Sequence, residues 1–438
     1  MTELIQLISI VLAFISHNHE AIAAANESSP SSSIVVHVNK HTDAATPLYS
    51  ANANFNVSWY FRQNGVPTPL PKQQNLLIDL DAPFIWHYCY PHQESCDACP
   101  YPVTCREYPC TDLRTTFSYK SPSCPPPTNS SIYEGYYDCE LCPVNIVNPV
   151  TGSCTQAIPT YDEFMFNITN DGRNVLSDLY TTYPTAACAP PSTFDPFPSN
   201  VFGVIALSSS PYALPEYLRD PVERIIALCL PCTLYSPGVL FLGNGPYYLL
   251  PQSHVDVRSL LSYTVLLKQP NSFGYFIGVK AIVIKNRSIN VGTNAITKIS
   301  TLDPYTKLRT DIYNNVVRRF SRVTKRIPPA KLKAPFGLCF NTTVNGTKVG
   351  LRVPDIDLVL RDGKKWTISS ANSIKQVTED VACLAFVDGG ATSEHAIVVG
   401  TYQFEDNFLL FDLENSSFGF SSSLLRRQTS CSNFFINF

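Results

Sequence analysis

The sequence lacks a strong net charge and, after its amino terminus, any long apolar run. Its 32 Lys and Arg residues nearly balance 35 Asp and Glu residues, so the formal net charge is −3. No basic stripe stands out, and we therefore expect no nucleic-acid partner. Beyond the first 23 residues no segment approaches the 18 or more uninterrupted apolar residues of a membrane helix, so we expect no membrane span.

The amino terminus has the pattern of a secretory signal. An apolar core runs from Leu4 to Ser16, and small residues at 21–23 form a cleavage site, although no Lys or Arg precedes the core. We expect residues 1–23 to be removed and the mature protein to be secreted and extracellular, in the apoplast or cell wall. The remaining chain is long enough for two lobes, which we expect at 24–220 and 221–438.

Fifteen cysteines, all after residue 88, suit an oxidising compartment. Three C-x-x-C pairs could instead hold zinc, but further cysteines lie between the first two pairs, which a metal ribbon would not need. We favour disulfides and expect neither a metal nor a cofactor. Spacing alone leaves the connectivity open, including that of all the cysteines from Cys89 to Cys188, and the odd total leaves one thiol over.

Eight Asn-x-Ser/Thr sequons are candidate glycosylation sites in a secreted chain. They begin at Asn26, Asn56, Asn129, Asn167, Asn286, Asn341, Asn345 and Asn415.

Short β-branched and aromatic runs alternate with Pro, Gly, Asn and Ser, which predicts an all-β protein. The expected strands include 76–86, 264–268, 274–284, 396–404 and 408–412. One helix is expected over 309–320, because apolar residues recur there at helical spacing. The stretch 91–127, dense in Pro and Cys, is typical of a stapled surface loop.

An apolar strand ends at Asp79, and Trp86 follows seven residues later. This pattern resembles the first half of the active site in pepsin-like aspartic proteases, where the strand ends in Asp-Thr/Ser-Gly. Here Asp81 takes the Gly position, and Ala82 stands where a Ser or Thr would bond the catalytic pair. The resemblance implies a first half-site with altered surroundings.

The second half-site should precede a helix, and the segment 299–316 is the candidate. Aligning it with the family's pre-helix turn puts Ser300 where the second Asp belongs. Because the mechanism needs two carboxylates that share one proton, a Ser there predicts an inactive pseudoenzyme. Losing one proton-transfer partner costs roughly 10²–10⁴ in rate. We expect an unpaired Asp79 to ionise near its reference value of about 4.

These acids have two other interpretations. Asp303 could be the second acid of an active endopeptidase, although Pro304 and Tyr305 would then fill the next two positions. Asp79 and Asp81 lie two residues apart and could form a carboxylate pair or metal site on one strand face. We favour Asp81 as a turn residue at the strand end.

The rest of the chain resembles the plant pepsin-like subgroup of xylanase inhibitors, xyloglucan-specific endoglucanase inhibitors, extracellular dermal glycoprotein and basic seed globulins. The resemblance is strongest from Gly238 onward. Matching segments include GVLFLGNGPY (238–247), YFIGVKAI (275–282), APFGLCF (334–340), VPDIDLVL (353–360), CLAFVDGG (383–390) and the run 402–425. The resemblance implies two six-stranded-type β-barrel lobes around a central cleft, with few short helices. In the less similar amino-terminal half, no Tyr stands at the flap near Asn148 and Pro149.

The resemblance also implies two disulfides, Cys339 with Cys383 and Cys229 with Cys431. It supplies no partner for Cys232, which we therefore expect to be the free thiol.

Inhibitors of this family place a basic side chain from a carboxy-lobe loop between the catalytic carboxylates of a glycoside hydrolase. The resemblance implies such a protein partner, a secreted endoglucanase or xylanase, for a monomeric inhibitor. The matching basic residues are Arg427, Arg426, Lys331 and Lys333, with Arg427 first and a solvated surface charge as its alternative. His395 lies on a loop and could also contact a partner. A storage or peptide-binding globulin is the remaining alternative.

Overall fold

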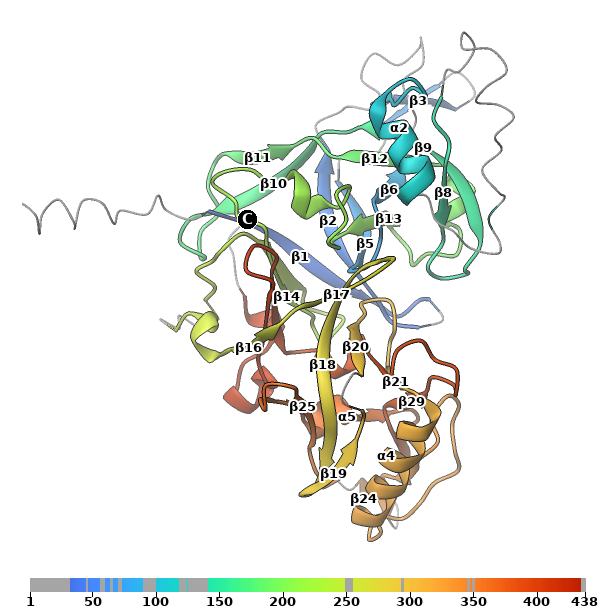
Figure 1. Ribbon diagram of the computed structural model, residues 1–438, viewed down its shortest axis with the longest axis vertical. Helices are drawn as coiled ribbons and strands as arrows, with labels where there is room; N and C mark the ends of the chain where they lie inside the picture. The colour runs from blue at the N-terminus through green and yellow to red at the C-terminus, as the bar shows by residue number, and fades with distance from the viewer. Residues whose placement is uncertain are drawn as a thin grey trace, which may run out of the picture.

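The computed structural model describes residues 32–44, 46–55, 60–63, 66–69, 73–89, 100–117, 124, 141–248, 255–292, 295–344, 347–348 and 351–434. These residues form two β-rich lobes stacked along the long axis of the molecule (Figure 1). The amino-terminal half, in blue and green, forms one end, and the carboxy-terminal half, in yellow to red, forms the other. The expected all-β, bilobal architecture is confirmed.

The described residues of the amino-terminal half form thirteen strands. They are β1 (Ser33–His41), β2 (Leu48–Phe55), β3 (Tyr60–Gln63), β4 (Val66–Pro69), β5 (Gln73–Asp79), β6 (Ile85–Tyr88), β7 (Tyr101–Pro102), β8 (Val144–Val147), β9 (Cys154–Tyr161), β10 (Phe164–Thr169), β11 (Leu179–Thr182), β12 (Thr185–Ala189) and β13 (Val201–Ala206).

The carboxy-terminal half has more numerous and shorter strands around one long strand, β18. They are β14 (Ile225–Cys229), β15 (Gly238–Leu242), β16 (Ser262–Val265), β17 (Leu267–Gln269), β18 (Ser272–Ile284), β19 (Arg287–Asn290), β20 (Ile296–Ile299), β21 (Thr306–Leu308), β22 (Cys339–Asn341), β23 (Thr343–Val344), β24 (Thr347–Lys348), β25 (Ile356–Leu360), β26 (Lys365–Ile368), β27 (Ile374–Gln376), β28 (Val381–Leu384), β29 (Phe386–Asp388), β30 (Ile397–Val399), β31 (Phe408–Asp412) and β32 (Ser417–Phe420).

Helices are short apart from α4. They are α2 (Tyr108–Asp112), α4 (Thr310–Val323), α5 (Ser370–Ser373) and α6 (Thr401–Phe404), the π-helix η1 (Leu113–Phe117), and the 3₁₀ helices η2 (Pro191–Phe194), η3 (Leu214–Tyr217), η4 (Val257–Leu260), η5 (Leu424–Arg427) and η6 (Cys431–Asn433).

One continuous sheet joins the two halves. Strand β1 pairs antiparallel with β15, in register from Ile34 opposite Leu242 to Val38 opposite Gly238. Beyond β15 the sheet continues through β14, β31, β32 and β16, and on the other side of β1 through β10, β2, β5 and β13. The runs IIALC of β14 and GVLFL of β15 are fully buried, which accounts for their lack of polar alternation.

The same three-strand arrangement occurs once in each lobe. In the first lobe, β13 pairs parallel with β5 and antiparallel with β6. In the second lobe, β30 pairs parallel with β20 and antiparallel with β21. The loops that follow β5 and β20 therefore leave equivalent strand ends. These two loops form the candidate site.

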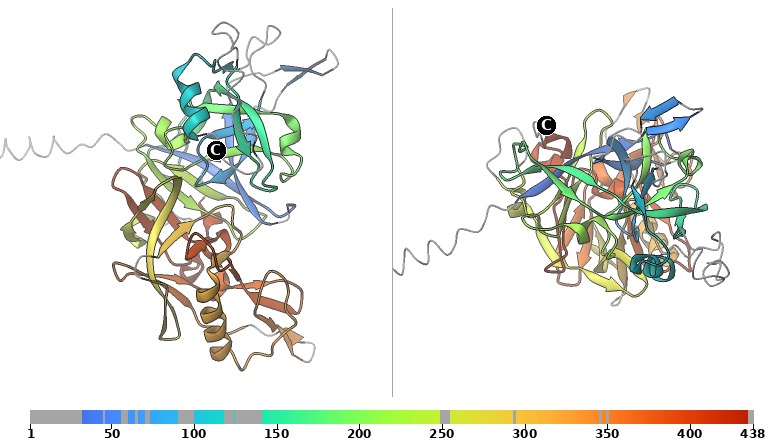
Figure 2. Two further views of the ribbon diagram at one scale, coloured as in Figure 1. Left: turned by 45° about the vertical axis from the view of Figure 1, so that its right-hand side comes forward. Right: turned by 90° about the horizontal axis from the view of Figure 1, so that it is seen from above.

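The expected helix is confirmed as α4, which begins at Thr310 and continues to Val323, three residues further than expected. Its residues Ile312, Val316 and Phe320 are buried against the strands of the second lobe. Figure 2 shows α4 running along that lobe, parallel to the long axis of the molecule.

Three expected strands differ from the observed ones. The segment 76–86 is broken by the loop between β5 and β6, and 264–268 is divided between β16 and β17, which belong to different sheets. The segment 396–404 is a strand only to Val399. At Gly400 an added Cβ would lie 2.5 Å from the backbone of Tyr305, and the chain then turns into α6, where Thr401 N–H donates to Asp303 O at 2.8 Å. A tertiary contact ends this strand, which the apolar pattern does not reveal.

The stretch 91–127, expected as a loop, is described only in part. Its described part contains α2 and η1, and Cys110 in α2 is bonded to Cys142. Disulfides also join Cys89 to Cys188, Cys124 to Cys154, Cys229 to Cys431 and Cys339 to Cys383. The last two pairs are those that the resemblance implies. Among the described cysteines Cys232 is the free one, and it is exposed.

Candidate functional site

A cavity of about 240 Å³ lies between the two lobes, where the loops after β5 and β20 meet. Its polar lining residues are Asp79, Asp81, Lys298, Ser300, Thr301 and Asp303. The structure thus brings together Asp79, Ser300 and the alternative acid Asp303 in one place. The volume of this cavity is below the roughly 300–1,000 Å³ of typical small-molecule sites.

The two loops are bonded to each other across the lobes. Leu80 N–H, next to Asp79, donates to the Thr301 hydroxyl, next to Ser300, at 3.3 Å. The ends of β5 and β20 are each bonded within their own lobe, and the two bonds are equivalent. Leu207 N–H donates to Asp79 O at 2.9 Å, and Ser300 N–H donates to Val399 O at 3.0 Å. These bonds fix the cleft floor in one geometry.

Asp79 is buried, and its carboxylate accepts the Asp81 N–H at 2.8 Å. Burial raises the pKa of Asp79 to about 6, against the opposing effect of the Asp81 N–H bond. The negative charge of Asp81 also raises this pKa, whereas Lys298 lowers it. The expectation of a value near 4 was wrong, because it neglected desolvation of the carboxylate.

Asp81 contacts the second lobe. Its carboxylate forms an ion pair with the Lys298 ammonium group and accepts the Ser272 hydroxyl at 2.9 Å. Gly274 makes room for this contact, since a Cβ there would lie 2.8 Å from the Asp81 carboxylate. The Gly-to-Asp change in the loop is therefore compensated by a cation and a glycine of the other lobe.

Ser300 and Asp303 are both engaged within their own loop. The Ser300 hydroxyl accepts the N–H groups of Leu302 at 3.3 Å and Asp303 at 3.1 Å. The Asp303 carboxylate forms an ion pair with Lys307 at 2.5 Å. The Ser300 side chain thus closes a turn.

A hairpin of the first lobe reaches the same cavity. Val147 at the end of β8 and Pro149 in the following turn line it. Asn148 holds this turn, since its side-chain oxygen accepts the Val150 N–H at 2.8 Å and its amide donates to Thr193 O at 2.8 Å. The hairpin occupies the place of the expected flap.

The predicted inhibitory residues lie in two regions that the structure does not bring together. Arg426 and Arg427 end helix η5, whose Leu424 packs beside β14 and β15. Lys331 and Lys333 belong to the segment before β22, where Ala330 packs in a different cluster with Phe336.

These basic side chains differ in their partners. Arg426 forms an ion pair with Asp355 at 2.5 Å. Arg427 and Lys331 are exposed, Lys333 is half-buried, and none of the three has an ion-pair partner among the described residues. His395 packs on Phe276 with ring centroids 5.3 Å apart, and burial lowers its pKa.

Four of the eight sequon asparagines lie in the described part of the chain. Asn167 is half-buried in β10, Asn341 is half-buried in β22, and Asn286 and Asn415 are exposed in turns. Glycosylation of all eight stays a prediction, and Asn26, Asn56, Asn129 and Asn345 lie outside the described residues.

One group of metal-ligand side chains occurs among the described residues. Atoms of His87, Cys89 and Asp162 lie within 4.8 Å of one another in the core of the first lobe. However, the Cys89 sulfur is bonded to Cys188, and His87 Nε2 lies 3.0 Å from the Asp162 carboxylate. A disulfide sulfur is not a thiolate ligand, so the group fits a packed core pair better than a metal site.

Sequence reasoning missed the role of Lys298. It lies two residues before Ser300 on an extended segment, so the two side chains share one strand face. The basic cluster in and after α4 was also missed. Five cations lie within residues 318–326, and the statement that no basic stripe stands out was wrong.

Comparison with known proteins shows the family. The family description "Xylanase inhibitor N-terminal" matches residues 60–244, and "Xylanase inhibitor C-terminal" matches residues 274–422. The chain is 32% identical to Chitinase CLP of Oryza sativa subsp. japonica over 413 residues, which cover 90% of this chain and 89% of the rice protein. The chain belongs to the xylanase-inhibitor family of pepsin-like proteins.

Solved structures of this family have the same fold. The crystal structure of edgp matches with a TM-score of 0.74 and 32% identity, covering 93% of this chain and 99% of that one. Conglutin gamma, a basic 7S globulin from lupine seeds, matches with a TM-score of 0.72 and 26% identity, covering 93% and 99%. The predicted pepsin-like fold is confirmed, and the family includes xylanase inhibitors and a seed globulin, which indicates a pseudoenzyme. Among the described residues, no helix is long and apolar enough to cross a membrane.

Proposed function

We propose that this protein is a secreted, catalytically inactive member of the family that binds and inhibits a cell-wall-degrading glycoside hydrolase. The observation that carries the proposal is the exposed Arg427 on an anchored helix, without an acidic partner among the described residues. The proposal has two parts: the cleft does not cut peptides, and Arg427 blocks a hydrolase.

The first part is supported by the arrangement around Asp79. The loops after β5 and β20 leave equivalent strand ends, and Ser300 is the residue next to the end of β20, as Asp79 is at the end of β5. A Ser hydroxyl cannot share a proton with Asp79 as a second carboxylate would. Its lone pairs already accept two N–H groups.

The alternative of an active endopeptidase would require Asp303 to act with Asp79. The Asp303 carboxylate is already paired with Lys307 at 2.5 Å, and the Asp81 carboxylate is paired with Lys298. Both carboxylates are thus engaged by lysine ammonium groups, whereas the protease dyad needs two carboxyl groups that share one proton with each other. The small volume of the cavity also disfavours an extended peptide.

The second part is supported by the chemistry of Arg427. Glycoside hydrolases hold two carboxyl groups about 5–9.5 Å apart. A guanidinium group donates planar, charge-assisted hydrogen bonds to carboxylates and keeps its charge at any physiological pH. Because Leu424 is buried and Arg426 is tied to Asp355, helix η5 would present Arg427 on a fixed base. Lys331 and Lys333 are the second choice, since an ammonium group lacks this planar geometry.

The test is a complex with purified secreted endoglucanases and xylanases. We expect a stoichiometric complex with at least one of them, and we expect Arg427→Ala to weaken inhibition by roughly 30-fold or more, as for a central interface arginine. Asp79→Ala and Lys268→Gln, at an exposed lysine of β17, are the matched controls and should inhibit normally.

Inhibition that survives Arg427→Ala but is lost in Lys331→Gln would move the site to the second loop. No effect on any hydrolase would favour the globulin alternative. Pepstatin-sensitive cleavage of a protein substrate at acid pH would contradict the inactive cleft.

A further inference from the structure

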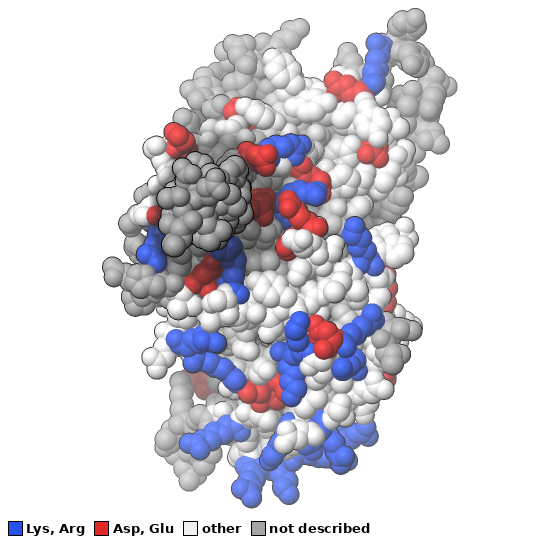
Figure 3. All heavy atoms as spheres, turned by 60° about the vertical axis from the view of Figure 1, so that its left-hand side comes forward, with Lys and Arg blue, Asp and Glu red and all other residues white. Residues whose placement is uncertain are grey.

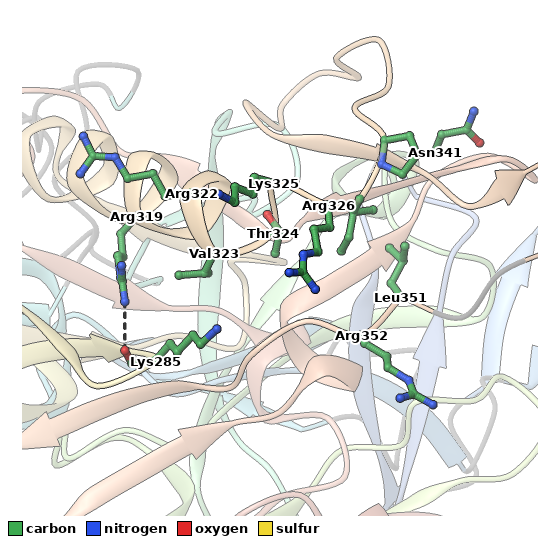
Figure 4. A pocket seen from close by; sticks show the side chains of 12 residues that line it. Lys285, Arg319, Arg322, Val323, Thr324, Lys325, Arg326, Asn341, Leu351 and Arg352 are labelled. Atoms are coloured by element: carbon green, nitrogen blue, oxygen red, sulfur yellow. Dashed lines mark hydrogen bonds between the residues drawn. The ribbon is translucent and has the colours of Figure 1, made fainter.

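A second cavity lies far from the cleft, at the carboxy-terminal end of α4. Its volume is about 860 Å³. Its walls are the last turn of α4 and the segment after it, the turn between β18 and β19, one residue of β22 and the segment before β25 (Figure 4). None of the residues discussed under the proposed function lines it.

The cationic lining is the distinguishing feature of this cavity. Six of its twelve lining residues are basic and none is acidic; the basic ones are Lys285, Arg319, Arg322, Lys325, Arg326 and Arg352. Figure 3 shows Lys and Arg side chains gathered at this lower end of the molecule, while Asp and Glu lie mainly further up. With a net charge of −3, the chain is not basic as a whole, so this cluster is a local feature.

The six cations have no ion-pair partner among the described residues. Some arginines elsewhere in the described structure are paired with acids, as Arg309 is with Asp311 at 2.7 Å and Arg224 is with Glu216 at 2.8 Å. Like charges that are brought together without counter-charges repel one another and raise the local positive potential. Binding of an anion in the cavity would therefore relieve this repulsion and would be favourable.

The lining also positions part of this charge. Arg319 donates to Ile284 O at 3.2 Å and to Lys285 O at 2.9 Å, which ties the helix to the β18–β19 turn. Figure 4 shows Lys285 and Arg326 pointing toward the space between the helix end and this turn. Apolar groups of Val323, Ile327 and Leu351 lie among the cations. Charged groups around apolar surface suit a ligand with both acidic groups and C–H faces.

We propose that this cavity binds a segment of an acidic polysaccharide through its carboxylate groups. A polyuronate chain carries one carboxylate on each sugar and apolar C–H faces between them, which matches the mixed lining. The five disulfides between described residues are typical of an oxidising compartment, where acidic glycans rather than nucleic acids are the expected polyanions. The site is separate from Arg427 and would hold the protein to a carbohydrate matrix.

The experiment measures binding of a de-esterified oligogalacturonate to the full-length protein by calorimetry at low and raised NaCl. We expect binding that weakens with salt, because the attraction is between charges. The variant Arg326→Gln/Arg352→Gln should bind about tenfold more weakly or worse, since two charge-assisted hydrogen bonds are removed from opposite walls. Lys268→Gln, with an exposed ammonium group outside the cavity, is the matched control and should bind normally.

Specific outcomes would overturn this assignment. The fully methyl-esterified oligomer must not bind; equal binding would mean that carboxylates are not recognised. Unchanged affinity of the double variant, or an equal loss in Lys268→Gln, would exclude the cavity. Tighter binding of a single-stranded oligonucleotide than of the oligogalacturonate would exclude the glycan class. Hydrolase inhibition by the double variant should be normal, so this proposal and the proposed function can fail independently.

Discussion

Asp79 illustrates how one residue's surroundings change its chemistry. The sequence shows an Asp at a strand end. In the structure its carboxylate is buried, and this burial raises its pKa to about 6. The folded state therefore favours the protonated form more than the unfolded state does, whose value is 3.8. The contribution of Asp79 to the free energy of unfolding is therefore fully present below its unfolded-state pKa of 3.8, and it is lost as the pH rises through about 6.

We accordingly predict that Asp79→Asn stabilises the protein at neutral pH and not at acid pH. The free energy of unfolding of the variant relative to the native protein should rise by roughly 2–3 kcal/mol between pH 4 and 7, from 1.36 kcal/mol for each pKa unit. Urea unfolding at both pH values measures it. Asp311→Asn is the control: Arg309 lowers the pKa of Asp311, so any pH dependence there has the opposite sign. A difference that does not depend on pH would contradict the prediction.

Only some of the residues at the candidate sites could be predicted from the sequence. The Asp79 loop and the Ser300 segment could be identified from the residues, and the structure places both at one cavity. The ion pair of Asp81 with Lys298 could not be predicted, because 217 residues separate the partners and only the packing of the lobes brings them together. The basic residues after Asn315 are visible in the sequence, but only the fold adds Lys285 and Arg352 to them.

At the scale of elements, α4 is the clearest agreement between pattern and structure. Its apolar residues recur at helical spacing, and Phe320 is fully buried and packs near Phe340, with ring centroids 6.4 Å apart. The opposite face carries the cations of the basic cavity. One helix thus contributes buried apolar residues to the core and basic residues to the cavity.

Truncating this helix in the core should destabilise the second lobe. We predict that Phe320→Ala lowers the free energy of unfolding by about 3–5 kcal/mol, because a large buried ring is replaced by a cavity. Thermal unfolding checks this. The exposed neighbour Ser321→Ala should change stability by less than about 0.5 kcal/mol. A loss in Ser321→Ala as large as in Phe320→Ala would contradict the assignment of the effect to burial, because both substitutions raise helix propensity.

At the scale of the whole molecule, two features hold the tail and the lobes together. The sheet through β1 and β15 joins the halves, and the disulfide of Cys229 with Cys431 closes a loop with a sequence separation of 202 residues. A crosslink over so long a loop restricts the unfolded chain strongly. The carboxy-terminal segment with η5 is therefore fixed near β14.

Removing this crosslink should have both a global and a functional effect. We predict that Cys229→Ser/Cys431→Ser lowers the free energy of unfolding by about 2–5 kcal/mol. It should also weaken any inhibition through Arg427, since η5 lies only a few residues before Cys431. Chemical denaturation and inhibition assays measure the two effects. Cys232→Ser removes the free thiol and should change neither; a comparable loss there would contradict the role of the disulfide.

The sequence by itself determined the all-β class, the helix, the half-site at Asp79 and the family, because local periodicity and motifs are properties of neighbouring residues. Tertiary structure alone decided the raised pKa of Asp79, the end of β30 at Gly400, the pairing of Asp81 with Lys298 and the assembly of the basic cavity from separate segments. Each of these depends on which groups meet in space and on how much water they lose there. Local sequence patterns do not encode either quantity.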